Sequence, residues 1–340
     1  MRRTLWLHPG IQRTGTTSIQ GFMSSNVKAL KKLGVLYPFK VRRHNQLMNE
    51  IFGGDADVRK VAAGLTRRAN ARKTPIHTIV LSDEAITVRR DLTVLTRFKE
   101  DFDVKVALFL RRQDLWLESW FFQNVKWQWN PPFSNCTFEE FLAKRDQFHW
   151  LDYDRYIAKL EDLFGAENVE VMIFEKSEME GGPVREFCRR IGITDFSTLE
   201  EPGHVNASLS PVMSEFVRHI PIRKGLGNTT RRAMVHALQE AEAALPDRFR
   251  ADGKLILSHE KRREIMDGFA DSNARLAKRR FGRDQLFRDP LPPETAPVAD
   301  LALPSDVTDL MEHFVVPVFS ELLAQGSISS RPKKGSSKNV

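Results

Sequence analysis

The stretch TLWLHPGIQRTGTTSIQ (Thr4–Gln20) contains an apolar run, a glycine loop and the start of a helical pattern. Gly10 and Gly15 are spaced as in a phosphate-binding loop, G-x-x-x-x-G. A nucleotide kinase or ATPase carries a lysine directly after the second glycine, whereas this chain has Thr16 there and a basic residue, Arg13, inside the loop. The stretch therefore predicts a strand, a loop and a helix that bind a phosphate-like anion without the usual lysine.

The rest of the chain alternates between apolar, β-branched runs and segments with helical periodicity. Further strands are predicted at Gly34–Pro38, Ile76–Leu81, Val104–Leu110 and Asn168–Phe174, and helices at Thr16–Leu33, Leu115–Val125 and Tyr156–Phe164. This alternation predicts the α/β class, with a P-loop-type parallel sheet flanked by helices. From about residue 205 the strand signals fade, so we expect a mainly helical C-terminal portion with helices at Ser258–Lys278 and Ser305–Leu323. We predict one domain over residues 1–326 and a basic flexible tail over residues 327–340.

The composition limits the class of protein. Hydrophobic residues make up 41% of the 340-residue chain, enough for a sizeable core, and the formal net charge of +8 favours an anionic ligand or surface. The two cysteines, Cys136 and Cys188, form neither a disulfide framework nor a metal-binding spacing, which is typical of a reducing compartment. No apolar run approaches the roughly 20 residues of a membrane-spanning helix, and the N-terminus lacks a signal-peptide core. We expect a cytoplasmic protein without a nucleic-acid partner, whose basic surface allows peripheral contact with an acidic membrane.

Ligands of an open parallel sheet bind beyond the carboxyl ends of the strands, so the residues after each predicted strand are candidates for a site. After the first strand, the glycines permit backbone conformations that other residues resist, and the following helix points its free N–H groups at an anion. Arg13 adds a charged fork suited to phosphate or sulfate oxygens, and Thr16 and Thr17 add hydroxyl donors. Arg111 lies at the end of the fourth strand, and Ser119 follows eight residues later within a helix. Each of these two could donate to one anionic group.

Two carboxylates, Asp83 and Glu84, follow the third predicted strand and belong to the same rim. A carboxylate near a bound anion is costly unless it performs a task such as accepting a proton. The other interpretation is a carboxylate at a helix N-terminus, stabilised by the helix dipole. The sequence alone leaves both interpretations open.

Two of these patterns carry a resemblance to a known family. The loop after the first strand has the form [KR]-[ST]-G-T-T, and a later strand end begins the pattern Arg-x7-Ser; both resemble motifs of the sulfotransferases. Members of that family transfer a sulfuryl group from 3′-phosphoadenosine 5′-phosphosulfate (PAPS). The segments LRRQDLWLESWFFQNVK, LDYDRYIAKLEDLFGAENVEVMIFE and FADSNARLAKRRFG are similar to bacterial members that sulfate carbohydrates. The resemblance spans residues 4–285, and only the two PAPS motifs in it are specific.

The resemblance implies that the loop holds the 5′-phosphosulfate, that the later motif holds the 3′-phosphate, and that no metal is required. The residues that would contact PAPS are Arg13, Thr14, Gly15, Thr16, Thr17, Ser18, Arg111 and Ser119. PAPS has no γ-phosphate, which agrees with the missing kinase lysine. Many members carry lysine where this chain has Arg13, and arginine supplies charge and donors but is a poor proton source.

The resemblance also implies an in-line displacement at sulfur, with a hydroxyl of the acceptor as nucleophile. Related enzymes place the base, a histidine or glutamate, at the rim after the third strand, where this chain has Glu84. Glu84 is therefore the predicted base, ahead of Asp83, and Arg13 would stabilise the leaving phosphosulfate. The implied acceptor is a carbohydrate or a glycolipid.

Weaker signals lie elsewhere in the chain. The segment RKGLGN (Arg223–Asn228) is similar to a late segment of cytosolic members that reaches the 3′-phosphate, through Arg223–Gly225 here; the other interpretation is a basic loop. His44 could meet the acceptor, although a lone surface histidine is more often incidental.

Four tryptophans follow the fourth strand. Trp116 and Trp120 are spaced for core packing on one helix, whereas Trp127 and Trp129, in the loop KWQWNPPF, are candidate acceptor contacts.

Two other functions stay open. A P-loop kinase or nucleotide hydrolase fits Gly10, Gly15 and Thr17, the last at the position of the Mg²⁺-binding hydroxyl, but such an enzyme needs the missing lysine. A homologue that binds PAPS or another anion without catalysis fits the presence of Arg13 in place of lysine.

Overall fold

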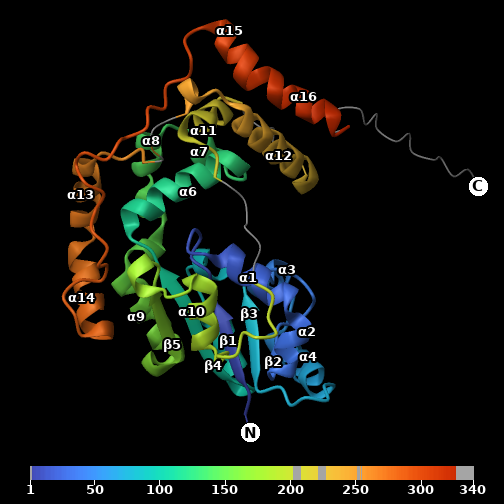
Figure 1. Cartoon of the computed structure of the whole chain (residues 1–340). Helices are drawn as coiled ribbons and strands as arrows, with labels where there is room; N and C mark the ends of the chain where they lie inside the picture. Colours follow the sequence, from blue (N-terminus) through green and yellow to red (C-terminus); the bar gives the residue numbers. More distant parts are fainter. Residues whose placement is uncertain (1, 202–207, 221–226, 251–252, 254, 327–340) are drawn as a thin grey trace, which may run out of the picture. The chain divides into compact units, whose positions relative to one another are not determined.

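The computed structural model describes residues 2–201, 208–220, 227–250, 253 and 255–326, which belong to two compact units (Figure 1). The first unit comprises Met1–Trp116, Asp146–Val205 and Arg263–Leu291, and the second comprises Leu117–Arg145, Asn206–Arg262 and Pro292–Val340. The single domain expected over residues 1–326 stays a prediction. The expected tail, residues 327–340, lies outside the described residues.

A parallel sheet forms the centre of the first unit. Among the described residues it has five strands in the order β2-β3-β1-β4-β5, and every neighbouring pair is parallel. The strands are β1 (Thr4–His8), β2 (Val35–Leu36), β3 (Thr78–Ser82), β4 (Asp103–Leu110) and β5 (Val169–Ile173). The predicted α/β class with a parallel sheet is confirmed, and each strand overlaps a predicted apolar run.

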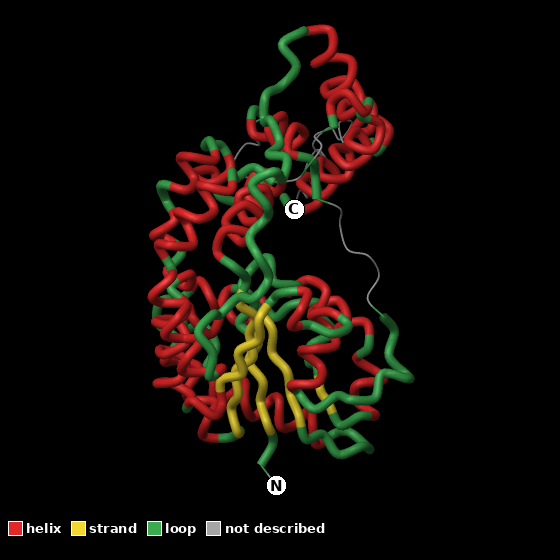
Figure 2. Tube along the Cα trace, turned by 60° about the vertical axis from the view of Figure 1, so that its left-hand side comes forward, coloured by secondary structure: helices red, strands yellow, loops and turns green. Residues whose placement is uncertain are grey.

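Helices cover both faces of this sheet (Figure 2). Successive strand residues point to opposite faces, and both Leu108 and Phe109 of β4 are fully buried, as expected of a strand covered on both sides. On the face of Phe109, a buried cluster joins the strands to α1 (Thr16–Ser25) and α10 (Gly182–Arg190). Helix α9 (Tyr153–Phe164) contacts β4 and β5. The unit also contains α2 (Val27–Lys32), α3 (Asn45–Gly53), α4 (Val58–Asn70), α5 (Ala85–Val88) and α14 (Ala270–Phe281).

Two helices predicted as continuous are each divided in two. The predicted helix Thr16–Leu33 is interrupted at Asn26, whose side-chain amide donates to the carbonyl of Glu200 at 2.9 Å and accepts from the Glu200 N–H at 2.8 Å. The predicted helix Ser258–Lys278 consists of α13 (His259–Gly268) and α14, separated at Phe269. The Ser258 hydroxyl accepts from the N–H of Lys261 at 3.2 Å and so caps the N-terminus of α13.

Among the described residues of the second unit, helices and connecting loops are joined by one isolated bridge, between Leu255 and Val298. It contains part of α6 (Gln113–Trp127) and of α13, together with α7 (Pro131–Ser134), α8 (Phe138–Leu142), α11 (Pro211–Arg218), α12 (Asn228–Ala244), α15 (Val307–Leu310) and α16 (Val316–Ala324). A buried ion pair between Arg262 and Glu118, at 2.5 Å, lies in its interior. The same Glu118 oxygen accepts the N–H of Leu257 at 2.8 Å.

The last helix contains a π turn, Met311–Val315, between α15 and α16. Phe314 and Val318 are buried, whereas Met311 and Val316 are exposed. A π turn has hydrogen bonds between residues i and i+5, so it holds more residues than an α turn. In the part of the chain that the structure describes, no helix has the length and apolar character needed to cross a membrane.

Candidate functional site

The predicted motifs of the first unit meet at one edge of the sheet. Strand β1 pairs in parallel with β3 on one side and with β4 on the other, so the carboxyl ends of all three are neighbours. The glycine loop follows β1, Asp83 and Glu84 follow β3, and Arg111 follows β4. Ser119 lies in α6, in the part that belongs to the second unit.

The backbone of the glycine loop is left-handed at two positions. Gly15 has a φ of 79° and Arg13 a φ of 68°. For a residue with a side chain this conformation costs about 1–2 kcal/mol, so Arg13 is held there by its surroundings. A Cβ on Gly15 would lie 2.7 Å from Cγ of Pro183, and a Cβ on Gly10 would lie 2.3 Å from Cγ2 of Thr16. Both glycines are therefore required by close approach.

Three side chains hold the carbonyl groups of the loop. Arg111 Nη1 donates to the carbonyl of Arg13 at 2.8 Å, and Trp116 Nε1 donates to that of Gln12 at 2.7 Å. The Thr87 hydroxyl donates to the carbonyl of Pro9 at 2.8 Å. A planar trans peptide carries its C=O and N–H on opposite sides, so these contacts turn the N–H groups that follow Gln12 and Arg13 away from Trp116 and Arg111. The loop thus presents N–H groups on its other side, as an anion requires.

The hydroxyl groups of the loop have different surroundings. The Thr14 hydroxyl is buried and donates to the carbonyl of Ile11 at 2.5 Å, so Thr14 would contact an anion through its backbone. Thr16 is also buried, whereas Thr17 and Ser18 are half-buried. Helix α1 begins at Thr16, and its first N–H groups lack partners within the helix, which adds donors and the positive end of the helix dipole.

Arg111 and its neighbour Arg112 have different roles. The guanidinium of Arg111 lies 5.6 Å from the centre of the Phe174 ring in addition to its contact with the loop. Arg112 is buried, pairs with Asp114 at 2.7 Å and donates to the carbonyls of residues 289 and 290. Arg112 is therefore structural, and Arg111 is the arginine that faces the loop. Burial lowers the pKa of Arg13.

The two carboxylates after β3 differ in how they are engaged. Asp83 is fully buried; its oxygens accept the Ala85 N–H at 2.7 Å and Nε of Arg43 at 3.0 Å. Burial raises the pKa of Asp83, and Arg43 opposes this rise. Glu84 keeps a side chain that is 13% exposed, with Oε2 at 3.5 Å from Nη1 of Arg43. A Cβ on Gly10 would lie 3.5 Å from Cγ of Glu84, so Glu84 is the carboxylate beside the loop.

A group of buried polar side chains lies at the ends of β1 and β3. His8 Nδ1 is 2.7 Å from the Ser82 hydroxyl, which also accepts from the Gln20 amide at 3.2 Å. Burial lowers the pKa of His8 to about 3, so its imidazole is neutral. Sequence reasoning missed this group and also missed Arg43; the only signal was a histidine at the end of an apolar strand.

His44 is buried, and the prediction of a surface histidine is wrong. Its Nδ1 accepts the N–H of Ser82 at 3.0 Å, which leaves Nε2 to donate to the carbonyl of Pro38 at 3.2 Å. Burial lowers the pKa of His44 to about 4. His44 thus fastens the segment after β2 to the end of β3 and is not exposed for an acceptor.

The structure confirms the prediction for the tryptophans in part: Trp120 is half-buried, and Trp127 is the last residue of α6 rather than part of a loop. Trp116 is fully buried against Phe148 and Trp150, with ring centres 5.2 and 5.9 Å away, which confirms core packing. In the second unit, Trp127 and Trp129 stack on each other, with ring centres 5.1 Å apart and planes 14° from parallel. Their role as acceptor contacts stays a prediction.

The stacked pair is held by buried polar groups. Gln128, between the two tryptophans, has a φ of 45° and donates from its side chain to the carbonyls of Val217 and Ile220. Arg231 donates to the carbonyl of Gln128 at 2.8 Å. Trp129 is 54% exposed, so the pair presents an aromatic face on a firmly held backbone.

Two further expectations concern the segment Arg223–Gly225 and metal ligands. Arg223–Gly225 lies outside the described residues. Among the residues that are described, no three His, Cys, Asp or Glu side chains are grouped as metal ligands. Cys136 and Cys188 are free and buried.

No protein-family model matches the chain. An uncharacterised protein of Archaeoglobus fulgidus is 26% identical to it over 216 residues, which is 62% of this chain and 55% of the relative. The match therefore covers about half the length of that relative. The similarity between the two chains is distant, and because the relative is uncharacterised it does not indicate an activity for this chain.

Proposed function

We propose that the chain is a PAPS-dependent sulfotransferase that transfers a sulfuryl group to a hydroxyl of a carbohydrate or glycolipid. One observation supports this most strongly: Arg111, at the end of β4, is bonded to the carbonyl of Arg13 in the loop after β1. This bond joins the two halves of the expected PAPS site. Glu84, the expected base, lies beside Gly10 of the same loop.

The residues present fit the parts of PAPS. The backbone N–H groups of the loop, the N-terminus of α1 and Arg13 would hold the 5′-phosphosulfate. Arg111 would hold the 3′-phosphate, and the contact of Ser119 with this group stays a prediction. A guanidinium has five N–H donors, so the contact of Arg111 with the loop is compatible with a contact to phosphate. No lysine is needed after Gly15, because PAPS has no γ-phosphate.

The proposed reaction is a single displacement at sulfur. The acceptor oxygen forms a bond to sulfur while the bond from sulfur to the 5′-phosphate oxygen breaks, and adenosine 3′,5′-bisphosphate leaves. Glu84 takes the proton of the acceptor hydroxyl, a role that is typically worth about 10²–10⁴ in rate. Arg13 and the N–H groups of the loop stabilise the charge that develops on the leaving phosphate. A cytoplasmic location, in which the buried free cysteines stay reduced, fits this function.

Calorimetric titration with adenosine 3′,5′-bisphosphate, beside ATP with Mg²⁺, tests the proposal. We expect micromolar binding of the bisphosphate, binding that is about 10- to 100-fold weaker in Arg111→Ala, and unchanged binding in Arg59→Ala. Arg59 is a suitable control because its exposed side chain pairs with the exposed Glu100, at 2.9 Å.

Two results would contradict the proposal. Tight binding of ATP with Mg²⁺ and none of the bisphosphate would favour the kinase alternative. Bisphosphate binding without release of bisphosphate from PAPS, in the presence of a panel of sugar acceptors, would favour the inactive homologue.

A further inference from the structure

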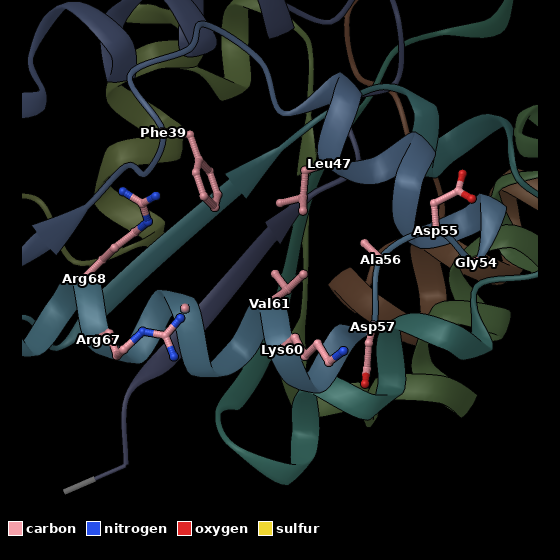
Figure 3. A pocket seen from close by; sticks show the side chains of 11 residues that line it. Phe39, Leu47, Gly54, Asp55, Ala56, Asp57, Lys60, Val61, Arg67 and Arg68 are labelled. Atoms are coloured by element: carbon pink, nitrogen blue, oxygen red, sulfur yellow. The ribbon is translucent and has the colours of Figure 1, made fainter.

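A groove of about 700 Å³ opens in the first unit between α3, α4 and the segment before α3 (Figure 3). Its volume lies within the range of sites for small molecules, about 300–1,000 Å³. Phe39, Leu47 and Val61 supply apolar surface, and Lys60, Arg67 and Arg68 supply positive charge. Figure 3 shows Arg67 and Arg68 toward the Phe39 end, with Asp55 and Asp57 toward the other.

The Phe39 ring is held in position. The guanidinium of Arg68 lies 4.8 Å from the ring centre, a cation–π contact, and the His44 ring packs edge-on at 5.9 Å. Phe39 is nevertheless 37% exposed, so part of the ring faces the solvent. An aromatic surface beside a guanidinium suits a ligand that has both an apolar face and an anionic group.

The backbone under this ring is strained. Phe39 and Lys40 are consecutive residues with side chains, and both are left-handed, with φ of 67° and 52°. Each costs about 1–2 kcal/mol, and such strain persists where the surroundings impose it. The Tyr37 hydroxyl donates to the carbonyl of Arg42 at 2.6 Å, and His44 binds the carbonyl of Pro38, so the strained residues are fixed from both sides.

Positive charge extends beyond the groove. Burial and the nearby Arg72 and Lys40 together lower the pKa of Lys31, so cations gather on this surface. Of the two acids in the groove, Asp57 accepts the N–H of Arg59 at 2.9 Å as the N-cap of α4. The Phe39 end of the groove is therefore suited to an anion.

The groove is connected to the candidate base by a short stretch of chain. Arg43, which pairs with Asp83 and Glu84, is four residues from Phe39. Four residues span at most about 14 Å, so the aromatic end of the groove lies within that distance of Arg43 along the backbone.

We propose that this groove binds the acceptor, and that the acceptor is an anionic saccharide. A sugar ring packs on Phe39, and its carboxylate, sulfate or phosphate group binds Arg67 and Arg68. The role as acceptor rests on the proposed sulfotransferase function. The binding of an anionic saccharide does not depend on that function.

Calorimetric titration with a heparin-derived tetrasaccharide, with the loop first saturated with adenosine 3′,5′-bisphosphate, tests this inference. Neutral maltotetraose is the matched ligand. We expect the heparin fragment to bind and maltotetraose to bind at least about tenfold more weakly, because a charge-assisted hydrogen bond is worth about that factor. Arg68→Glu should weaken binding of the heparin fragment at least about tenfold, and Phe39→Ala should weaken it as well.

Arg59→Glu is the matched control, since it makes the same change of charge on α4 at a residue outside the groove. Its affinity for the heparin fragment should stay close to that of the wild type. An equal loss of affinity in Arg59→Glu and Arg68→Glu would show that only the overall charge of α4 matters, and it would overturn the inference. Tighter binding of a single-stranded oligonucleotide of equal charge would overturn it too.

The bisphosphate titration of the same samples separates the two proposals. If the bisphosphate binds and the heparin fragment does not, the groove proposal fails and the sulfotransferase proposal stands. If the heparin fragment binds through Arg68 and the bisphosphate does not bind, the saccharide site stands and the proposed function fails. Thermal melting of each variant shows that it is folded.

Discussion

The guanidinium of Arg111 donates a hydrogen bond to the main-chain carbonyl of Arg13, at 2.8 Å, across 98 residues of sequence. The residue that follows β4 is thereby bound to the loop that follows β1. A substitution at Arg111 acts on both the charge of the site and the shape of the loop. Lysine keeps the charge and a donor but not the planar fork, whereas alanine removes all three.

We expect Arg111→Ala to weaken binding of adenosine 3′,5′-bisphosphate about 10- to 100-fold, because a hydrogen bond to a charged group is worth about 1.5–3 kcal/mol. Arg111→Lys keeps a donor for the carbonyl of Arg13 but loses the planar fork, so its affinity should be intermediate. Calorimetry measures both. Full affinity in Arg111→Ala would show that Arg111 does not contribute to binding of the bisphosphate.

Gly15→Ala should abolish anion binding and lower the melting temperature. Alanine at this position is strained by the φ of 79°, and its Cβ would lie 2.7 Å from Pro183. Gly21, in α1, is the control, because a Cβ there meets nothing within 4 Å. Gly21→Ala should stabilise the protein by about 0.5–1 kcal/mol. Chemical denaturation gives both free energies of unfolding, and equal effects of the two substitutions would contradict this account.

Arg13→Gly should separate stability from binding. Glycine adopts the left-handed φ of 68° without strain, so the melting temperature should stay equal or rise. The affinity for the bisphosphate should fall, since the charged fork is lost. A lower melting temperature together with retained affinity would show that Arg13 has a structural role instead.

Glu84→Gln should lower the rate of sulfuryl transfer by about 10²–10⁴ and leave the affinity for the bisphosphate unchanged. Asp83→Asn is the matched control, because both oxygens of Asp83 are engaged by Arg43 and Ala85 and the side chain is fully buried. Its rate should stay within about tenfold of the wild type. Release of bisphosphate from PAPS with an acceptor measures the rates. Unchanged turnover in Glu84→Gln would remove Glu84 from the mechanism.

The stability of the protein should fall as the pH is lowered from about 6.5 toward 3. Burial depresses the pKa of His8 to about 3 and that of His44 to about 4, so both stay neutral in the folded state and become charged on unfolding. Stabilisation by such groups is complete above the unfolded pKa of about 6.5 and is lost as the pH falls through the folded pKa. Asp83, whose pKa is raised, acts in the opposite direction, since its contribution is lost as the pH rises.

His8→Asn tests this origin of the acid sensitivity. It should reduce the slope of the free energy of unfolding against pH by up to about 1.4 kcal/mol for each pH unit below 6.5. Denaturation with urea at pH 7, 6, 5 and 4 measures the slope. Equal slopes in the variant and the wild type would show that groups other than His8 cause the acid sensitivity.

The sheet and the loop were predictable because their signals are local. An apolar run of five residues followed by G-x-x-x-x-G defines β1 and the loop without reference to the rest of the chain. The strand ends then place Glu84 and Arg111 at one edge, since neighbouring parallel strands share their carboxyl ends.

The features that could not be predicted depend on partners far away in the sequence. Asn26 interrupts a helix that is periodic in sequence, because it bonds to the backbone of Glu200. His44 resembles a surface residue until the N–H of Ser82 is placed against it. Arg43 belongs to no recognisable sequence motif. Its ion pairs with Asp83 and Glu84 become apparent only in the structure.

The interleaved order of the two units has a consequence for biosynthesis. Helix α14 (Ala270–Phe281) contacts α9 (Tyr153–Phe164), where Arg275 pairs with Asp154 at 2.9 Å. A ribosome adds about 5–20 residues per second, so a nascent chain waits roughly 6–23 s between the end of α9 and the end of α14. During that interval the apolar surface that α14 covers is exposed. The first unit, which begins to fold first, is therefore completed late. A chaperone that holds this surface would act before synthesis of the second unit is complete.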